Sequence, residues 1–144
     1  MTITSTRSYS DWPVEWTPKA YAERLHEWLK PFTDEPEAIL KAVDHALKGP
    51  FGGGVFFVER NQELIGTAVI NCTGMSEYIP ENILVYIAVH PEHRKKGIGH
   101  QVLEKVLREF PGAFALHVEY DNPARHLYER MGFCSKYAEM RLQR

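Results

Sequence analysis

The sequence is poor in cysteine and has neither a long apolar stretch nor an excess of charge of one sign. Its 144 residues include two cysteines, Cys72 and Cys134, which stand far apart and outside any C-x-x-C pair. That scarcity argues against a disulfide framework and against a thiolate zinc site. No run of 18 apolar residues occurs, so no membrane-spanning helix is predicted, and the first ten residues lack the apolar core of a signal peptide. We therefore expect a cytoplasmic protein without a membrane partner.

The charge is nearly balanced, with 17 lysines and arginines against 19 aspartates and glutamates and a net charge of −2. Broad binding to nucleic acid needs a strongly basic face, so we expect no nucleic-acid partner. Hydrophobic residues make up 44% and charged residues 25%, which is the balance of an ordinary globular protein. With no internal repeat and no linker, the chain is predicted to form one domain over residues 1–144.

Two helices are predicted in the first third of the chain. Thr17 and Pro18 provide an N-cap and a first helical residue, and Pro31 ends the helix. Its buried face is marked by apolar residues at helical spacing: Tyr21, Leu25, Trp28 and Leu29. A D-x-x-E capping box that begins at Asp34 predicts the start of a second helix, which ends at Gly49.

The rest of the chain alternates strands with helices. Helical spacing predicts a long helix from Gly97 to Phe110 and a short one that starts at Asn122. The apolar run 83–89 shows no alternation, which is typical of a strand covered on both faces. The segments rich in β-forming residues are 2–9, 55–60, 63–72, 83–89, 113–120 and one or two strands within 133–142. Together these elements predict an α/β (α+β) fold, with a mixed central sheet of about six to seven strands flanked by about four helices.

Chemistry is concentrated at the start of the long helix, where Gly97 and Gly99 stand. Glycine in a helix costs roughly 0.5–1 kcal/mol relative to alanine, and a bound ligand would explain why both positions are glycine. Without Cβ atoms, the free N–H groups of the first turn can closely approach an anion, and the helix dipole favours one there. Three basic residues precede the glycines: Arg94, Lys95 and Lys96. The segment therefore predicts a phosphate or pyrophosphate site.

Two common phosphate motifs do not fit this segment. No Lys-Ser or Lys-Thr follows the glycines, as a P-loop requires, and the third glycine of the dinucleotide fingerprint is replaced by Val102. A solvated basic loop that leads into an ordinary helix stays open as an alternative.

Two separated segments resemble the GNAT superfamily of acyl-CoA N-acyltransferases. Residues 87–103, with Arg94-Lys95-Lys96-Gly97-Ile98-Gly99, resemble its motif A, [QR]-x-x-G-x-[GA]. Residues 122–133, Asn-Pro-Ala-Arg-His-Leu-Tyr-Glu-Arg-Met-Gly-Phe, look like its motif B. Asn122 precedes Tyr128 by six residues, one fewer than is usual in that motif. The order and separation of the two motifs match the family, and the resemblance implies a single GNAT-like domain.

The resemblance implies acetyl-CoA as cosubstrate and no metal. Its pantetheine arm would pair with the strand backbone at Ile87, Ala88 and Val89. The backbone near Val89 would also stabilise the oxyanion. The pyrophosphate would be held by the loop and helix start, through Arg94, Lys95, Lys96, Gly97, Ile98, Gly99 and His100. Asn122 is the motif B residue expected to contact the cosubstrate.

The implied reaction is attack of a primary amine on a thioester. At pH 7, freeing the lone pair of an alkylamine of pKa ~10.4 costs roughly 4–5 kcal/mol, so a general base is needed. The resemblance assigns Tyr128 as the proton donor to the leaving thiolate. His117, whose unperturbed pKa near 6.5 suits a base at neutral pH, is the candidate base. Glu119 and Glu77 are the alternatives.

Several features of the reaction stay open in the sequence. The acceptor is a small-molecule or peptide amine, and Tyr78, Glu81 and the three tryptophans (Trp12, Trp16 and Trp28) are candidates for lining its pocket. A homodimer through a late strand is also open. A histidine group, His90, His93 and His100, flanks the basic loop but does not predict a metal site. The alternative functions are a non-catalytic acyl-CoA-binding regulatory module and a nucleic-acid-binding domain that uses His-Arg-Lys-Lys.

Overall fold

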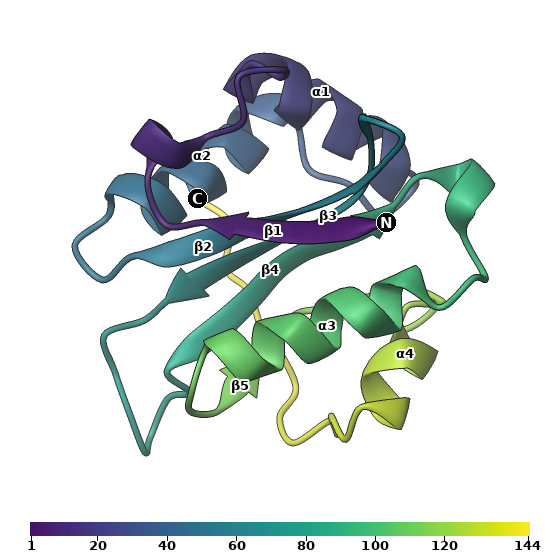
Figure 1. Ribbon diagram of the computed structural model, residues 1–144. Coiled ribbons are helices and arrows are strands. Elements are labelled where there is room, and N and C mark those ends of the chain that lie inside the picture. Colours follow the sequence, from purple (N-terminus) through teal and green to yellow (C-terminus); the bar gives the residue numbers. More distant parts are fainter.

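The computed structural model describes all 144 residues, and its five strands form one sheet with helices on both faces (Figure 1). The strands are β1 (Thr2–Thr6), β2 (Gly53–Arg60), β3 (Glu63–Cys72), β4 (Asn82–Val89) and β5 (Phe114–Ala115). The α-helices are α1 (Pro18–Leu29), α2 (Pro36–Lys48), α3 (Ile98–Glu109) and α4 (Arg125–Arg130). Two 3₁₀ turns, η1 (Tyr9–Asp11) and η2 (Pro91–His93), lie in the connections.

The sheet is mixed, as the sequence predicted. Its order is β1-β2-β3-β4-β5, with antiparallel pairs from β1 to β4 and a parallel pair between β4 and β5. A β-bulge lies between β3 and β4, where Val69 and Ile70 face Tyr86 and Leu84 and leave Val85 without an opposite residue. The bulge adds a residue to β4 shortly before Ile87, at the end of the strand that leads to the basic loop.

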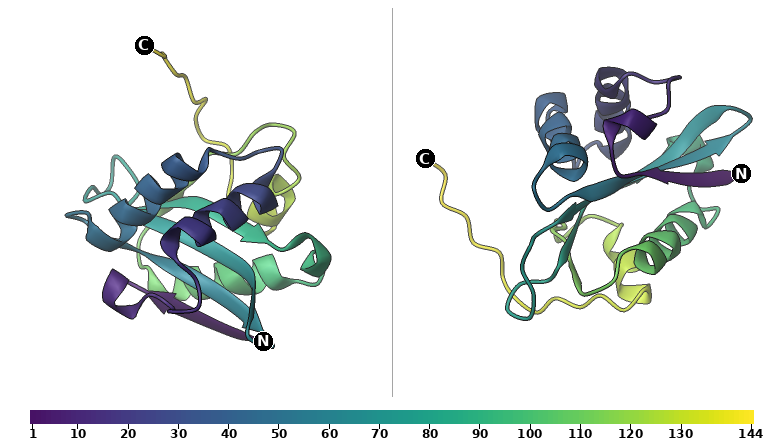
Figure 2. Two further views of the ribbon diagram at one scale, coloured as in Figure 1. Left: turned by 90° about the horizontal axis from the view of Figure 1, so that it is seen from above. Right: turned by 60° about the vertical axis from the view of Figure 1, so that its left-hand side comes forward.

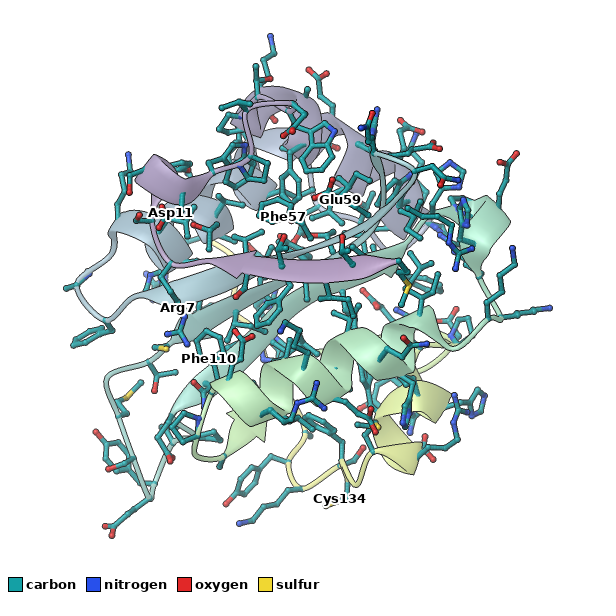
Figure 3. The ribbon with its side chains drawn as sticks, viewed as in Figure 1. Arg7, Asp11, Phe57, Glu59, Phe110 and Cys134 are labelled. Atoms are coloured by element: carbon teal, nitrogen blue, oxygen red, sulfur yellow. The ribbon has the colours of Figure 1, made fainter.

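Two layers of helices give the sheet two cores. Helices α1 and α2 cover one face, and α3 and α4 cover the other (Figures 1 and 2). Phe57 points into the first layer and Phe110 lies in the second (Figure 3). In β4, Ala88 packs with the α1/α2 core and Leu84 with the α3 core. The prediction that the apolar run 83–89 is a strand covered on both faces is therefore confirmed.

The two N-terminal helices start by different means. Thr17 caps α1 as predicted, because its side chain accepts a hydrogen bond from the Ala20 amide at 3.1 Å. The predicted capping box at Asp34 is wrong, since α2 begins at Pro36 and the side chain of its N-cap residue, Glu35, makes no cap bond. Asp34 instead accepts a hydrogen bond from the Tyr86 hydroxyl of β4. A tertiary contact has taken the carboxylate that the local pattern assigned to the helix.

The predicted strands at the C-terminal end are wrong in extent. Of residues 113–120, only Phe114 and Ala115 pair as a strand. Residues 134–144 form no strand and no backbone hydrogen bond, and this tail projects from the body of the molecule (Figure 2). The sheet therefore has five strands, and not six or seven. Alternating residues do not suffice for a strand when no neighbouring edge accepts their backbone groups.

The remaining elements follow the sequence closely. The predicted edge strand within residues 2–9 is present as β1, and the hairpin is present as β2 and β3. The short helix starts at Arg125, three residues later than predicted. None of the helices combines the length and the apolar character that a membrane crossing requires.

Candidate functional site

β4 has a free backbone edge at the end that leads to the basic loop. Its pairing with β3 runs along the strand, whereas β5 pairs with it only at Asn82 and Ile83. Beyond these two residues the strand has no neighbour on the β5 side. An extended ligand with amide groups can therefore add along this edge by backbone hydrogen bonds. The residues predicted to pair with a pantetheine arm lie on this stretch: Ile87, Ala88 and Val89.

Arg94 anchors the loop that follows β4. Its Nε donates to the Val89 carbonyl at 3.0 Å, and its Nη2 donates to the Trp28 carbonyl in the last turn of α1. The guanidinium therefore ties the loop to the end of β4 and to α1. Lys95 and Lys96 are exposed and form no ion pair, so their positive charges are available to a ligand.

Six successive backbone amides in this loop and helix start, those of residues 95–100, donate no hydrogen bond to any protein group. They comprise the four orphan donors expected at a helix N-terminus and two loop amides before them. Lys95 and Gly97 both have positive φ, 62° and 80°. Left-handed residues beside right-handed ones give the backbone form of an anion-binding nest. The predicted phosphate site thus has unsatisfied amide donors at six of its seven predicted residues: Lys95, Lys96, Gly97, Ile98, Gly99 and His100. Arg94 differs, because its amide donates to the Pro91 carbonyl and its guanidinium binds the Val89 and Trp28 carbonyls.

The two glycines also have local structural reasons that the sequence analysis missed. Gly97 is the N-cap of α3 and adopts φ 80°, a conformation that strains other residues. A Cβ on Gly99 would lie 3.2 Å from Leu127 Cδ2, so Gly99 lets α3 approach α4. The view that only a ligand explains these glycines is therefore wrong. The close approach at Gly99 brings motif A next to motif B.

Tyr128 lies on α4 and is buried in the core formed with α3. Its ring packs on Phe133, with the ring centroids 5.9 Å apart. Burial, and then the nearby charge of Glu119, raise the pKa of the Tyr128 hydroxyl to about 12. The hydroxyl bonds to no protein group, yet it is not among the fully enclosed polar atoms. It therefore stays protonated at neutral pH and is free to donate to a ligand.

Asn122 uses its side chain within its own turn. Its Oδ1 accepts from the Ala124 amide at 2.9 Å, and its Nδ2 donates to Glu119 Oε1 at 3.1 Å. It therefore shapes the turn before α4, and its backbone N–H is also used, by Glu119 O. An open hollow of about 360 Å³ surrounds this turn, and Arg125 and His126 contribute to its lining.

His117 and Tyr128 occupy different sides of the chain segment that follows β5. The neighbours of His117, Leu116 and Val118, pack against the same core as Tyr128. In an extended chain, alternation then directs His117 away from that core, and its side chain is exposed. Glu119, the alternative base, is close enough to raise the pKa of Tyr128 and already binds Asn122.

The predicted acceptor-pocket residues do not gather at this end of β4. Tyr78 and Glu81, like the alternative base Glu77, precede the first residue of β4, whereas Val89 is its last. At about 3.3 Å per residue, the two ends of this strand are roughly 23 Å apart. Glu81 accepts a hydrogen bond from the Ala113 amide. All three tryptophans pack in or against the α1/α2 core: Trp12, Trp16 and Trp28.

Sequence reasoning missed a polar pair on the α1/α2 side of β4. The Tyr86 hydroxyl donates to Asp34 Oδ2 across the sheet face. Burial, followed by the contact with Asp34, raises the pKa of Tyr86 above its usual range. Tyr86 precedes Ile87 directly, so this pair flanks the free backbone edge. Only the alternation of Tyr86 with Ala88 signalled which face it occupies.

The histidines near the loop form no metal-binding group, and no cluster of three or more histidine, cysteine or acidic side chains occurs in the molecule. His90 packs edge-on against Trp28 and His93, and His100 pairs with Glu104 one turn along α3. The Nδ1 atom of His93 is buried without a hydrogen-bond partner.

A family model described as "Acetyltransferase (GNAT) domain" matches residues 52–135, which is more than half of the chain. This stretch contains β2 to β5, α3, α4 and both motifs. No curated protein matches the sequence significantly.

Solved structures share the fold at low sequence identity. A protein assigned to the GNAT acetyltransferases from Desulfovibrio desulfuricans is 23% identical, with a TM-score of 0.70 over 94% of this chain and 86% of that chain. A ribosomal-protein-alanine N-acetyltransferase from Brucella melitensis is 16% identical, with a TM-score of 0.65 over 99% of this chain and 97% of that chain. The aminoglycoside N-acetyltransferase AAC(6')-Iy, solved with CoA, is 16% identical, with a TM-score of 0.70 over 99% and 93%. The fold and the family match agree, and this chain belongs to the GNAT acetyltransferase family.

Proposed function

We propose that the protein transfers the acetyl group of acetyl-CoA to a primary amine, by direct attack of that amine in a ternary complex. The observation that carries the proposal is the run of six unsatisfied amides, residues 95–100, directly after the free edge of β4. The amides and the exposed Lys95 and Lys96 suit a diphosphate. The free edge suits the amides of a pantetheine arm. Acetyl-CoA contains both groups in that order.

Starting from the ammonium form, the proposed reaction removes two protons from the nitrogen and delivers one to the sulfur. A base takes the first proton and frees the lone pair. The amine then forms a C–N bond as the C–S bond of the thioester breaks, and the nitrogen loses its second proton to solvent. Tyr128, which keeps its proton to high pH, donates to the sulfur that leaves. A backbone N–H near Val89 stabilises the oxyanion. His117 is the proposed base, because it is exposed and alternates away from the core that contains Tyr128.

The acceptor is a small-molecule or peptide amine. The structurally similar proteins include an aminoglycoside acetyltransferase and a ribosomal-protein-alanine acetyltransferase, so the same fold serves both kinds of acceptor. The carboxylate of Asp34, at the Tyr86 hydroxyl, offers a negative charge on the α1/α2 side of β4. An amine that approaches from that side meets the thioester from the face opposite to Tyr128.

The test combines acetyl-CoA binding by calorimetry with thiol release on a panel of amines. Lys96→Glu reverses an exposed charge beside the free amides, and we expect acetyl-CoA to bind about 3- to 10-fold more weakly. Lys19→Glu makes the same charge change at an exposed position of α1 and is the control. Unchanged binding in Lys96→Glu contradicts the diphosphate site. Tight binding without thiol release over the whole panel favours a non-catalytic acyl-CoA-binding module.

A further inference from the structure

The guanidinium of Arg94 is bound to the protein, unlike the six backbone amides that follow it. Its Nε donates to the carbonyl of Val89 at 3.0 Å, and its Nη2 donates to the carbonyl of Trp28. The backbone amide of Arg94 is also used, because it donates to the Pro91 carbonyl. The run of free amides begins one residue later, at Lys95. The bonds of Arg94 therefore hold parts of the protein together at the border of the proposed diphosphate site.

Arg94 caps the C-terminal end of α1. The Trp28 carbonyl belongs to the last turn of this helix, and no backbone N–H donates to it. Carbonyls at a helix C-terminus lack partners within the helix, and the helix dipole favours a positive charge there. The ring of Trp28 is buried and packs edge-on against His90, with the ring centroids 5.5 Å apart. A charge-assisted hydrogen bond and an aromatic contact therefore join the end of α1 to the loop after β4.

The turn between α1 and α2, residues 30–35, is bonded to this capped end. The Phe32 amide donates to the Leu29 carbonyl at 2.9 Å. The backbone carbonyl of Asp34 lies 2.8 Å from Nδ1 of His26, which belongs to the last turn of α1. The position of the turn therefore depends on where the end of α1 is held.

The side chain of Asp34 connects the turn to β4. Its Oδ2 accepts a hydrogen bond from the Tyr86 hydroxyl, whereas its Oδ1 has no partner and the residue forms no ion pair. Asp34 is also exposed. Tyr86 adjoins Ile87, which lies on the free edge of β4. The exposed Oδ1 therefore lies on the α1/α2 side of this edge, where it can bind an ammonium group.

We propose that Arg94 is a positioning residue for the acceptor amine and not a ligand of the diphosphate. Arg94 fixes the end of α1, the end of α1 fixes the turn, and the turn holds Asp34 against β4. The free oxygen of Asp34 then binds the ammonium group of the acceptor. A carboxylate next to the amine would be repelled by Asp34, so the acceptor is a cationic amine without a neighbouring carboxylate. This inference rests on the proposed function.

The first experiment compares Arg94→Met with Arg24→Met, which makes the same change at an exposed position of α1. Calorimetry measures the dissociation constant of acetyl-CoA, and thiol release measures the KM of the best amine of the panel. In Arg94→Met we expect the dissociation constant to stay within about 3-fold and the amine KM to rise about 10- to 100-fold. Arg94→Lys should restore part of the KM, because lysine keeps the charge but lacks the planar fork that reaches both carbonyls.

Arg24→Met should match the wild type in both quantities. A diphosphate ligand predicts the opposite split for Arg94→Met. Acetyl-CoA binding that weakens about 10-fold or more while the amine KM stays unchanged therefore overturns the proposal.

The second experiment follows the turn itself and needs no acceptor. Amide hydrogen exchange, read by NMR, should become about 10-fold faster at Phe32 in Arg94→Met, because the end of α1 is no longer held. The Gly49 amide, which donates to the His45 carbonyl at the end of α2, is the matched control and should be unchanged. Unchanged exchange at Phe32, or an equal rise at Gly49, overturns the positioning role.

The third experiment tests the carboxylate at an exposed position, where the substitution does not endanger folding. We expect Asp34→Asn to raise the amine KM about 10-fold without changing acetyl-CoA binding. Each amine of the panel is paired with its counterpart that has a carboxylate on the same carbon, and the preference for the first should shrink in Asp34→Asn. Glu37→Gln, an exposed carboxylate in the first turn of α2, is the control.

An unchanged amine KM in Asp34→Asn overturns the role of this carboxylate. The absence of thiol release with every amine contradicts the proposed function itself. The exchange experiment then still decides whether Arg94 holds the turn, so the two failures are distinguishable.

Discussion

The Tyr128 hydroxyl is a buried group without a protein partner, and its pKa of about 12 keeps it neutral where most tyrosines begin to ionise. The ring is buried but the hydroxyl is not fully enclosed, so a ligand can reach it. In the proposed reaction, the sulfur of the leaving thiolate is that partner. The same burial that raises the pKa also prevents Tyr128 from acting as a base.

Replacing Tyr128 by phenylalanine keeps the packing of its ring and removes its hydroxyl. We expect Tyr128→Phe to lower kcat about 10- to 100-fold, because the ring remains while the proton donor is lost. The KM for acetyl-CoA should change little. Steady-state thiol release measures both quantities. Tyr120→Phe, an exposed tyrosine eight residues earlier, is the matched control, and an unchanged kcat in Tyr128→Phe removes this residue from the acid role.

Among the secondary-structure elements, α1 is joined to the centre of the sheet by a buried chain of hydroxyls. The hydroxyl oxygen of Tyr21 on α1 lies 2.6 Å from Thr67 Oγ1 on β3. Thr67 Oγ1 donates in turn to the Phe56 carbonyl of β2 at 2.7 Å. Because the Thr67 hydroxyl donates its only proton to the Phe56 carbonyl, the Tyr21 hydroxyl must be the donor in its hydrogen bond with Thr67. The chain therefore has a fixed direction from helix to sheet.

A double-mutant cycle tests whether the two hydroxyls act as a unit. Thr67→Val leaves the Tyr21 hydroxyl buried without an acceptor, so we expect it to lower the free energy of unfolding by about 1–3 kcal/mol. Tyr21→Phe in that background should cost much less than Tyr21→Phe alone, because the hydroxyl it removes is already unpaired. Urea unfolding of the four proteins gives the coupling. Simple additivity shows that the two hydroxyls do not act as a unit.

The contact between α3 and α4 depends on the absence of a side chain at Gly99. An added Cβ meets the flexible end of Leu127 at 3.2 Å. We expect Gly99→Ala to be accommodated by a small shift of Leu127. Gly99→Val adds two methyl groups more than Gly99→Ala and should lower the free energy of unfolding by about 1–3 kcal/mol. The comparison of denaturant midpoints for these two variants measures the closeness of the helices, and equal midpoints contradict it.

The molecule as a whole contains several tyrosines whose pKa values are raised in the folded state: Tyr9, Tyr21, Tyr86 and Tyr128. For Tyr128 the pKa is about 12 when folded against 10 as a free side chain. Above pH 10 the unfolded chain loses protons that the folded chain keeps, so high pH favours unfolding. Below pH 10 this contribution to stability is fully present.

The contribution of these tyrosines to stability against denaturant should therefore change little between pH 8 and 10. It should fall as the pH approaches 12. Tyr128 accounts for at most about 3 kcal/mol of the loss, since its pKa differs by about two units and each unit corresponds to about 1.4 kcal/mol. Urea midpoints at pH 8, 10 and 11.5 measure the fall. Tyr128→Phe should show a shallower decline over the upper interval, and an identical decline rules out a raised pKa at Tyr128.

Patterns among residues that are close in the sequence were sufficient to predict many secondary-structure elements of this protein. The cap at Thr17, the apolar face of α1, the β2–β3 hairpin and the amphipathic α3 all appear where local patterns predicted them. The two motifs also indicated the family from sequence alone, because each occupies one short segment. Their residues specify a turn or a helix start largely through contacts within that segment.

Contacts between distant segments determined the rest. Asp34 binds Tyr86 in place of its helix, and Arg94 turns to the carbonyl of Trp28. Gly99 makes room for Leu127, and residues 116–118 and 134–144 remain unpaired although their sequences alternate. A strand exists only where another edge accepts its backbone, and a polar side chain goes to whichever partner the folded chain brings nearest. Neither condition can be predicted from a local pattern, because both depend on which surfaces the whole chain brings together.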